Sequence, residues 1–421
     1  MSGLNSQANA GPVWPGLQRR NVVGGAVLAP LACAARGAEP MPTHPLSSAV
    51  PGEWPASAAA RTDFAAPAPL VPMQARRDRI IDISVCTRPF RAQGPRLEAQ
   101  RLAGKTVVHN YGHGGSGWSL SWGSAHLAVQ MALATLAPRD SHIAVIGCGA
   151  IGLTSALVAQ RAGLRVCVYC REQPPDVSSM AAAGVRSPGS RICSEAHATP
   201  DFRQRWEVLA RHSFRRFQTL LGLAGRPVEW CDGYALWDAP GSQPSELGHE
   251  RDNEPPYPDL AVQLRDLQPR PQRLAPHEHP FAVALAVRYT QLVFNLASYS
   301  RLLMHEFLLR GGEIVVRDFS SPRQFAALKE RTLINATGYG ARALLGDDTL
   351  IPVRGQTARL LPQSDVHYGI TYRSHNLSVV ARRDGLLVQA QADGDFGNPS
   401  TVSDRAGSEA AVDRLAALFK P

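Results

Sequence analysis

Residues 142–152 read HIAVIGCGAIG, and this stretch decides the fold. Its first five residues form a short apolar run that is typical of a buried parallel strand. Gly147, Gly149 and Gly152 then lead into a helix. The first glycine permits a tight turn, the second lets the backbone approach a pyrophosphate, and the third allows the helix to pack closely on the strand. Because the start of such a helix presents unpaired N–H groups to phosphates, the stretch predicts a dinucleotide-binding strand, turn and helix.

A second strand is predicted over Arg165–Tyr169, and an acidic residue follows it. Glu172 lies about twenty residues after the last glycine, where a carboxylate normally binds the ribose hydroxyls of a dinucleotide. Arg171 occupies the place that a strict alignment would favour. Glu172 is therefore interpreted either as the ribose ligand or as a surface residue at the start of a loop.

A second glycine-rich signature, HNYGHGGSG at residues 109–117, stands before this fingerprint and is followed by Trp122-Gly123. Glycines in such a signature let the backbone crowd against a planar ligand where a Cβ atom would intrude. Two later segments add to the pattern. Ser178–Gly184 combines hydroxyl-bearing and small residues, and Ile334–Gly338 is predicted to be a strand that ends in Ala-Thr-Gly.

Together these segments resemble the flavin-binding signatures of the D-amino-acid oxidase family. Pro352–Gln356 stands at the family's distance from the Ala-Thr-Gly signature, and Arg79–Ile81, Arg88–Arg91 and Arg96–Glu98 reproduce the strand and loop that precede the HNYGHGG segment in the family. The resemblance covers most of residues 76–400. In the family, however, the fingerprint opens the chain and the HNYGHGG-type segment lies near its end. This chain therefore resembles a circularly permuted member.

The resemblance implies an α/β fold with a Rossmann-like FAD-binding domain and a second, substrate domain built on a mixed or antiparallel sheet. The FAD-binding domain is predicted to be discontinuous, at residues 76–190 and 305–360, and the substrate domain at residues 191–304 and 361–421. The residues that the resemblance assigns to FAD are Gly147, Gly149, Ala150, Ile151, Gly152, Glu172, Ser178, Ser179, Gly184, Thr337, Gly338, Gly114, Gly115, Gly117 and Ser119. Ser119 is expected beside the pyrimidine C2 carbonyl, and the helix that follows is expected to favour an anionic reduced flavin through its N-terminal dipole.

Three residues are assigned to the substrate by resemblance. Arg88 is expected to grip the carboxylate of an amino acid with two parallel hydrogen bonds, although an arginine beside a proline is also typical of a surface charge. The backbone of Gly115 is expected to meet the substrate amine, and the hydroxyl of Tyr289 to lie over the substrate. His109 and His113 are interpreted as positioning residues, because hydride transfer from a neutral amine needs no protein base. Arg91 and Arg96 are interpreted as structural.

The expected reaction is oxidation of a D-amino acid by molecular oxygen, and two alternatives stay open. One is a dehydrogenase of the same fold with a different electron acceptor. The other is a flavin-binding protein without turnover, because family members commonly carry a Gly-Gly pair where this chain has Gln389-Ala390-Gln391. Arg186 replaces a residue that is often apolar in the family, and it is interpreted either as favouring acidic substrates or as facing solvent.

The N-terminal region is predicted to stand apart from the catalytic part. Residues 1–38 resemble a twin-arginine export signal, with Arg19-Arg20 before a weakly apolar run, and residues 39–75 are rich in Pro, Ala and Ser, as in a disordered linker. Folded structure is expected to begin near Arg76. A periplasmic location is expected if the signal functions. A cytoplasmic protein with a disordered tail that contains a chance arginine pair is the alternative.

Composition excludes several classes of partner. No stretch reaches the roughly 18–20 apolar residues that a membrane-spanning helix needs. The net charge of +9 comes from scattered arginines without a basic block, so no nucleic-acid partner is expected. The seven cysteines include the pair Cys167 and Cys170, which a three-residue offset in a strand points to opposite faces, so no metal site is expected. A homodimer is compatible with the sequence, which does not decide the oligomeric state.

Overall fold

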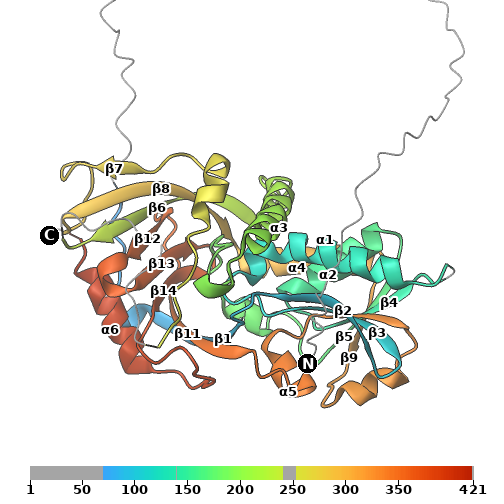
Figure 1. Ribbon diagram of the computed structural model, residues 1–421. Coiled ribbons are helices and arrows are strands. Elements are labelled where there is room, and N and C mark those ends of the chain that lie inside the picture. The colour runs from blue at the N-terminus through green and yellow to red at the C-terminus, as the bar shows by residue number, and fades with distance from the viewer. Residues whose placement is uncertain (1–69, 139, 240–252, 420–421) are drawn as a thin grey trace, which may run out of the picture. The chain divides into compact units, whose positions relative to one another are not determined.

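The computed structural model describes residues 70–138, 140–239 and 253–419. The predicted export signal, and all but the last six residues of the predicted linker, lie outside these ranges. Residues from Pro67 onward cluster as one unit, which contains two β-sheets (Figure 1).

The first sheet has six strands in the order β2-β3-β10-β4-β5-β9. Its strands are β2 (Arg96–Leu102), β3 (Lys105–Tyr111), β4 (His142–Ile146), β5 (Arg165–Cys170), β9 (Glu313–Val316) and β10 (Thr332–Asn335). All neighbours are parallel except β2 and β3, which form an antiparallel hairpin. The strand, turn and helix predicted from residues 142–152 are confirmed, since β4 leads directly into α2 (Ala150–Arg161).

Helices α1 (Gly117–Thr135), α2 and α4 (Leu296–Leu309) lie together beside this sheet (Figure 1). Their small and aliphatic side chains form one core with β4 and β5. Within this core, the indole Nε1 of Trp122 donates a hydrogen bond to the hydroxyl of Tyr299 at 2.7 Å. Cys167 and Cys170 pack into different cores on the two faces of β5, so the predicted divergence of their side chains is confirmed.

The second sheet is mixed and has eight strands in the order β1-β11-β14-β13-β12-β6-β8-β7. Its strands are β1 (Ile80–Phe90), β6 (Val228–Trp237), β7 (Gln272–Leu274), β8 (Leu285–Phe294), β11 (Ile351–Leu360), β12 (Tyr368–Tyr372), β13 (Leu377–Arg382) and β14 (Gly385–Ala390). β12 and β6 are parallel and the other pairs are antiparallel. The remaining helices are α3 (Pro200–Gln218), α5 (Ala341–Leu345) and α6 (Arg405–Ala416).

Two expectations about boundaries need correction. Met73 and Ala75 are buried in the core of the second sheet, so ordered packing begins before Arg76. β1 and β11 pair with each other in the second sheet, whereas the sequence prediction counted both with the FAD-binding part. In both cases the segment contacts residues that are far away in the sequence. The hydroxyl of Tyr368 donates to the carbonyl of Val71 at 2.7 Å, and β1 pairs with β11.

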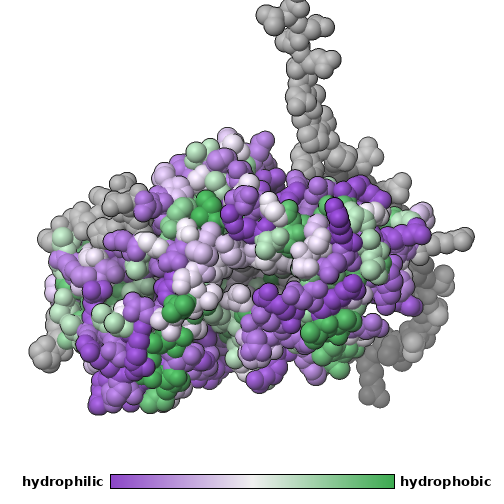
Figure 2. All heavy atoms as spheres, turned by 90° about the horizontal axis from the view of Figure 1, so that it is seen from below, coloured by the Kyte–Doolittle hydropathy of each residue, from purple (hydrophilic) through white to green (hydrophobic). Residues whose placement is uncertain are grey.

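On the face in Figure 2, hydrophilic residues predominate and hydrophobic residues form separate small groups. None of the helices in the described ranges combines the length and the apolar character that crossing a bilayer requires.

Candidate active site

The predicted site residues gather at one edge of the six-stranded sheet. His109 of β3, Asn335 of β10 and Ile146 of β4 are in register at the carboxyl ends of adjacent parallel strands. Tyr169 of β5 is in register with Ile146. Four loops with predicted roles therefore leave the sheet at the same edge, which is where open α/β sheets bind their ligands.

A cavity of about 2300 Å³ opens at this edge and extends to the second sheet. Of the site residues predicted from the sequence, all except Gly152 and Ser119 line it. Cavities for drug-sized ligands are typically on the order of 300–1000 Å³. This cavity therefore has room for a dinucleotide together with a small substrate.

The turn after β4 requires its first and third glycines. Gly147 has a φ of +110°, and a Cβ atom there would lie 2.5 Å from the carbonyl oxygen of Ala336. A Cβ atom on Gly152 would lie 2.0 Å from the carbonyl oxygen of Gly147. Gly149 is less constrained, since its Cβ atom would meet only the hydroxyl of Ser179, at 3.3 Å. A Cβ atom on Gly149 would therefore meet only a side chain that can rotate. This openness is expected at the second glycine of the motif, where the backbone approaches the pyrophosphate.

The hydroxyl-bearing segment lies across the start of α2. Ser178 and Ser179 belong to a short 3-10 helix, Ser178–Ala181, and both line the cavity. The Oγ of Ser179 accepts a hydrogen bond from the Ala150 N–H at 3.2 Å. The segment thus places hydroxyl groups beside the N–H groups that would meet a pyrophosphate.

At the predicted ribose position, Glu172 lines the cavity together with Arg171. The Nε of Arg171 donates to Glu172 Oε1 at 3.1 Å, and both side chains are exposed. Glu172 is thus within the site, and its role toward a ribose stays a prediction.

The loop after β3 packs against residues 190 and 191. Gly114 has a φ of +54°, and a Cβ atom there would lie 2.0 Å from the carbonyl oxygen of Arg191. The Gly115 N–H donates to the carbonyl of Ser190 at 3.0 Å, so its own carbonyl is the backbone group left for a substrate amine. Gly117 faces open space, with no atom within 4 Å of a Cβ position.

Ser119 does not reach the cavity. Its hydroxyl is buried and accepts a hydrogen bond from the Ser187 N–H at 2.8 Å. Ser187 lines the cavity in its place. Ser119 is therefore absent from the cavity wall, and its contact with the pyrimidine C2 carbonyl stays a prediction.

Both histidines of the signature are buried and neutral at physiological pH. Burial lowers the pKa of His109 to about 4 and that of His113 to about 3. The Nε2 of His113 lies 2.8 Å from the hydroxyl of Ser124, and the Nε2 of His109 lies 2.9 Å from Gln100 Oε1. These contacts support a positioning role.

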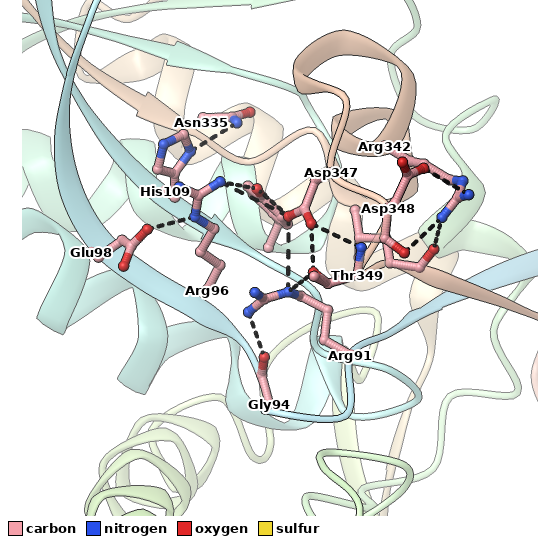
Figure 3. Close-up of polar contacts among 12 residues, drawn as sticks. Arg91, Gly94, Arg96, Glu98, His109, Asn335, Arg342, Asp347, Asp348 and Thr349 are labelled. Carbon is pink, nitrogen blue, oxygen red and sulfur yellow. Dashed lines mark hydrogen bonds and ion pairs between the residues drawn. The ribbon is translucent and has the colours of Figure 1, made fainter. Parts of the chain in front are cut away.

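A polar network holds the β3 strand against the chain before β11 (Figure 3). The hydroxyl of Tyr111 donates to Asp347 Oδ2 at 2.7 Å and accepts from Arg96 Nη1 at 2.9 Å. Arg91 donates from its Nε to the hydroxyl of Thr349 at 2.8 Å. Neither arginine lines the cavity, in keeping with the structural role predicted for them.

Arg88 lies in β1 and forms part of the cavity wall. Its Nη1 donates to the carbonyl of Arg354 at 2.8 Å, and no described residue accepts from its other guanidinium nitrogens. Burial lowers its pKa, and the nearby Arg191 lowers it further, whereas Asp395 and Glu254 raise it. Arg88 therefore keeps donors for a carboxylate in the cavity.

Tyr289 lines the cavity from β8, and its hydroxyl is 2.9 Å from the hydroxyl of Thr371. Gln389 and Gln391, which stand in place of the family's Gly-Gly pair, also line the cavity. This wall of the cavity therefore carries the polar side chains of Tyr289, Gln389 and Gln391.

One feature of the site was missed by sequence reasoning, and one interpretation needs correction. Arg191, with a φ of +50°, pairs with Glu254 at 3.0 Å, and both side chains are largely buried. The partners are 63 residues apart, and no local pattern signals such a pair. Arg186 is 6% exposed, so the interpretation that it faces solvent is wrong.

A fingerprint turn, a second glycine-rich loop and a guanidinium that meet in one cavity define a dinucleotide-binding protein with a place for an anionic substrate. Residues 142–421 match the family model of the FAD dependent oxidoreductases (DAO), and the chain belongs to this family. Its cofactor is therefore FAD. The residues present fit FAD, because Gly147 and Gly152 make a turn that a Cβ atom would fill, and Gly117 and Gly338 leave open space in the cavity wall.

Curated relatives are oxidases of D-amino acids. A D-amino-acid oxidase of Rubrobacter xylanophilus is 26% identical over 285 residues, which is 65% of this chain and 76% of the relative. A D-aspartate oxidase of Talaromyces thermophilus is 49% identical over 59 residues, which is 14% of this chain and 16% of the relative. Among solved structures, an L-amino acid deaminase from Proteus vulgaris with its insertion sequence deleted has a TM-score of 0.42 and 12% identity, covering 67% of this chain and 75% of that chain.

Proposed function

The chain is an FAD-dependent amino-acid oxidoreductase, and we propose that its substrates are D-amino acids and its electron acceptor is molecular oxygen. A relative that matches this chain over 76% of its own length is a D-amino-acid oxidase. The observation that carries the proposal is Arg88, a cavity guanidinium with donors that no described residue uses.

In the proposed reaction the amino acid loses a hydride from Cα and a proton from its nitrogen. Bound FAD would supply the two-electron acceptor for this hydride, and molecular oxygen would take up the two electrons and two protons as hydrogen peroxide. Water hydrolyses the imino acid to a 2-oxo acid and ammonia. The chemistry thus consumes one amino acid, one oxygen and one water for each turnover.

The chain's own residues bind and orient. Arg88 holds the carboxylate through charge-assisted hydrogen bonds, which fix both the position and the tilt of the substrate. The carbonyl of Gly115 accepts a hydrogen bond from the amine, since its N–H is already bonded to Ser190. Tyr289 closes the opposite wall and excludes water. Together they present Cα–H in one orientation, which is a matter of positioning rather than acid–base catalysis.

One experiment distinguishes the proposed oxidase from a dehydrogenase with a different electron acceptor and from a flavin-binding protein without turnover. The purified flavoprotein is mixed anaerobically with D- and L-amino acids, its absorbance near 450 nm is followed, and oxygen is then admitted. Bleaching by D-amino acids, reversed by oxygen with release of peroxide, is the expected result. Bleaching that a quinone reverses but oxygen does not indicates a dehydrogenase, and bleaching by L-amino acids alone refutes the proposed stereochemistry. If no amino acid bleaches the flavin, the result supports the alternative of a flavin-binding protein without turnover.

We further propose that the order of segments is a circular permutation of the family fold. Arg77 forms ion pairs with Asp413 and Glu409 of α6, so the start and the end of the described chain lie together. A chain rearranged to begin at Ser141, with residue 421 joined to Leu70 and a new end at Pro138, keeps the buried Met73 and Ala75 and is expected to fold and bind FAD. Failure of this rearranged chain to bind FAD, when the original order does, would count against the permutation.

The N-terminal segment is proposed as a twin-arginine export signal. Replacing Arg19-Arg20 by two lysines is expected to retain the protein in the cytoplasm of a bacterial host that exports the original chain to the periplasm. Equal periplasmic amounts of both versions would refute the signal.

A further inference from the structure

Two polar side chains face the cavity from the middle of the second sheet. On β13 and β14, Val379 and Val388 are buried in the core that also contains α6. Because successive side chains of a strand point to opposite faces, their chain neighbours Ser378 and Gln389 point away from that core. Both of these residues line the cavity, and they are paired directly across the two strands. The sheet therefore presents a hydroxyl and an amide side by side to the cavity.

The fold itself makes no use of these two side chains. Gln389 and Ser378 are half-buried, and among the described residues neither the amide nor the hydroxyl has a hydrogen-bond partner. Gln356 of β11 differs, since its amide donates to the hydroxyl of Ser408 at 2.8 Å. An amide that is partly removed from water without a partner is unfavourable for folding. The donors and acceptors of Gln389 and Ser378 are therefore left for a ligand.

Two longer side chains lie across the sheet toward this pair, each over a glycine of the neighbouring strand. The guanidinium of Arg88 on β1 fills the space of a side chain at Gly355 on β11, where a Cβ atom would lie 2.5 Å from Nη2. The ring of Tyr289 on β8 fills the corresponding space at Gly233 on β6, 2.4 Å from a Cβ atom. The hydroxyl of Tyr289 is 2.9 Å from that of Thr371 on β12. Arg88 and Tyr289 therefore approach β13 and β14 from opposite sides.

The order of the strands sets the distance from Arg88 to the polar pair. β14 is the next strand after β11, and β13 follows it. Neighbouring strands lie about 4.8 Å apart, so Gln389 is on the first strand beyond the guanidinium and Ser378 on the second. An amino-acid side chain of three or four heavy atoms spans roughly 4–5 Å. When the substrate carboxylate is bound to Arg88 and the side chain lies along the sheet, its end reaches Gln389 and Ser378.

We propose that Gln389 and Ser378 form the subsite for the substrate side chain, and that this subsite selects amino acids with an uncharged amide side chain. The inference rests on the proposed function, in which Arg88 binds the substrate carboxylate. An amide can both donate to and accept from the glutamine, and it can accept from the serine hydroxyl. An apolar side chain of the same shape would leave these groups unpaired. A side-chain carboxylate would find no compensating charge on either residue.

The test measures binding to the holoprotein through the change in flavin absorbance and requires no turnover. Its probes are three carboxylates of similar length and shape. They are 4-carbamoylbutanoate, which ends in an amide, 5-methylhexanoate, which ends in an isopropyl group, and glutarate, which ends in a second carboxylate. The original chain is expected to bind 4-carbamoylbutanoate roughly tenfold or more tightly than the other two. Gln389→Leu is expected to weaken binding of 4-carbamoylbutanoate roughly ten- to hundredfold and to leave that of 5-methylhexanoate within about threefold.

Two further variants complete the design. Gln272→Leu is the matched control, because Gln272 lies on β7 of the same sheet, is exposed and does not line the cavity. It is expected to change each dissociation constant by less than about twofold. Ser378→Ala removes only the hydroxyl and is expected to weaken binding of 4-carbamoylbutanoate roughly three- to tenfold. This variant also tests the subsite if Gln389→Leu does not fold.

The outcomes separate this inference from the proposed function. Equal affinities of the original chain for the amide and the isopropyl probe would overturn the inference, and so would the same loss in Gln272→Leu as in Gln389→Leu. Tighter binding of glutarate would also overturn it and would indicate a subsite for acidic side chains. A higher kcat/KM for D-glutamine than for D-methionine, abolished by Gln389→Leu, would support both proposals. Selective binding of the amide probe without oxidation of any D-amino acid would support the subsite and refute the proposed oxidation.

Discussion

Replacement of Gly152 by alanine is expected to release FAD and to destabilise the fold. The new Cβ atom would lie 2.0 Å from the carbonyl oxygen of Gly147 and 2.8 Å from its carbon. Both atoms belong to the backbone of the turn and cannot rotate away. Helix α2 must therefore move from β4 by roughly 1.5 Å to reach an ordinary van der Waals separation.

The expected loss of FAD affinity follows from the distance over which a hydrogen bond persists. A bond of about 2.9 Å is lost when its atoms separate beyond roughly 3.5 Å, so the shift of α2 removes its N–H groups from the pyrophosphate. Two bonds to a charged group contribute about 1.5–3 kcal/mol each. Losing both raises the dissociation constant for FAD by roughly 10²–10⁴. The strained packing lowers the free energy of unfolding by a further 1–3 kcal/mol or so.

Gly149→Ala provides the matched comparison within the same turn. Its Cβ atom would meet only Ser179 Oγ, at 3.3 Å, and that side chain can rotate. This variant is expected to weaken FAD binding while its unfolding midpoint without FAD stays within about 2 °C of the original. Flavin content after gel filtration, FAD titration by fluorescence quenching and thermal unfolding measure these quantities. The reasoning fails if Gly152→Ala binds FAD within threefold of the original chain.

Arg88→Met is expected to keep FAD but to weaken binding of acetate, a carboxylate probe, by roughly ten- to hundredfold; unchanged acetate binding would exclude the assigned role. The pKa values of His113 (about 3) and His109 (about 4) in the folded chain lie below the roughly 6.5 of the unfolded chain, so their stabilisation is full above pH 6.5 and falls by about 1.4 kcal/mol per unit for each histidine, or about 2.8 kcal/mol per unit for both, as the pH drops toward 4. Urea unfolding between pH 7 and pH 5 is expected to show this slope and His113→Asn to reduce it, whereas parallel slopes would argue against the assignment. Tyr299→Phe leaves the buried Nε1 of Trp122 without its acceptor and is expected to cost about 1–3 kcal/mol, and a change below about 0.5 kcal/mol in chemical unfolding would refute the importance of that bond.

The parts of the fold that the sequence predicts best are those governed by local patterns. β4, the turn and α2 follow from an apolar run and three spaced glycines within eleven residues, and the turn requires Gly147 and Gly152 for the steric reasons that the motif implies. Gly114 is similar, since its positive φ and close approach to Arg191 accommodate only glycine. In these places neighbouring residues determine the conformation, so one sequence is sufficient.

The features that escaped prediction depend on partners far away in the chain. β1 pairs with β11 across more than 260 residues, so nothing near Ile80 reveals which sheet it joins. The sequence around Met73 is that of a Pro- and Ala-rich linker, but Met73 is buried against the second sheet. Arg186 lies in a segment whose family pattern predicts an apolar residue, and its burial without a counterion becomes visible only when α3 and β8 surround it.

The architecture of the cavity is compatible with the proposed circular permutation. β10 lies between β3 and β4, and its parallel pairing with both brings the HNYGHGG loop, the Ala-Thr-Gly loop and the fingerprint turn to one edge. This adjacency depends on strand pairing and not on which strand comes first. α1 and α2 pack together, and residues 137–141 join the end of α1 to β4 with a short connection. Short connections between packed elements add little closure entropy, so the site is expected to tolerate the new order as long as these pairings are kept.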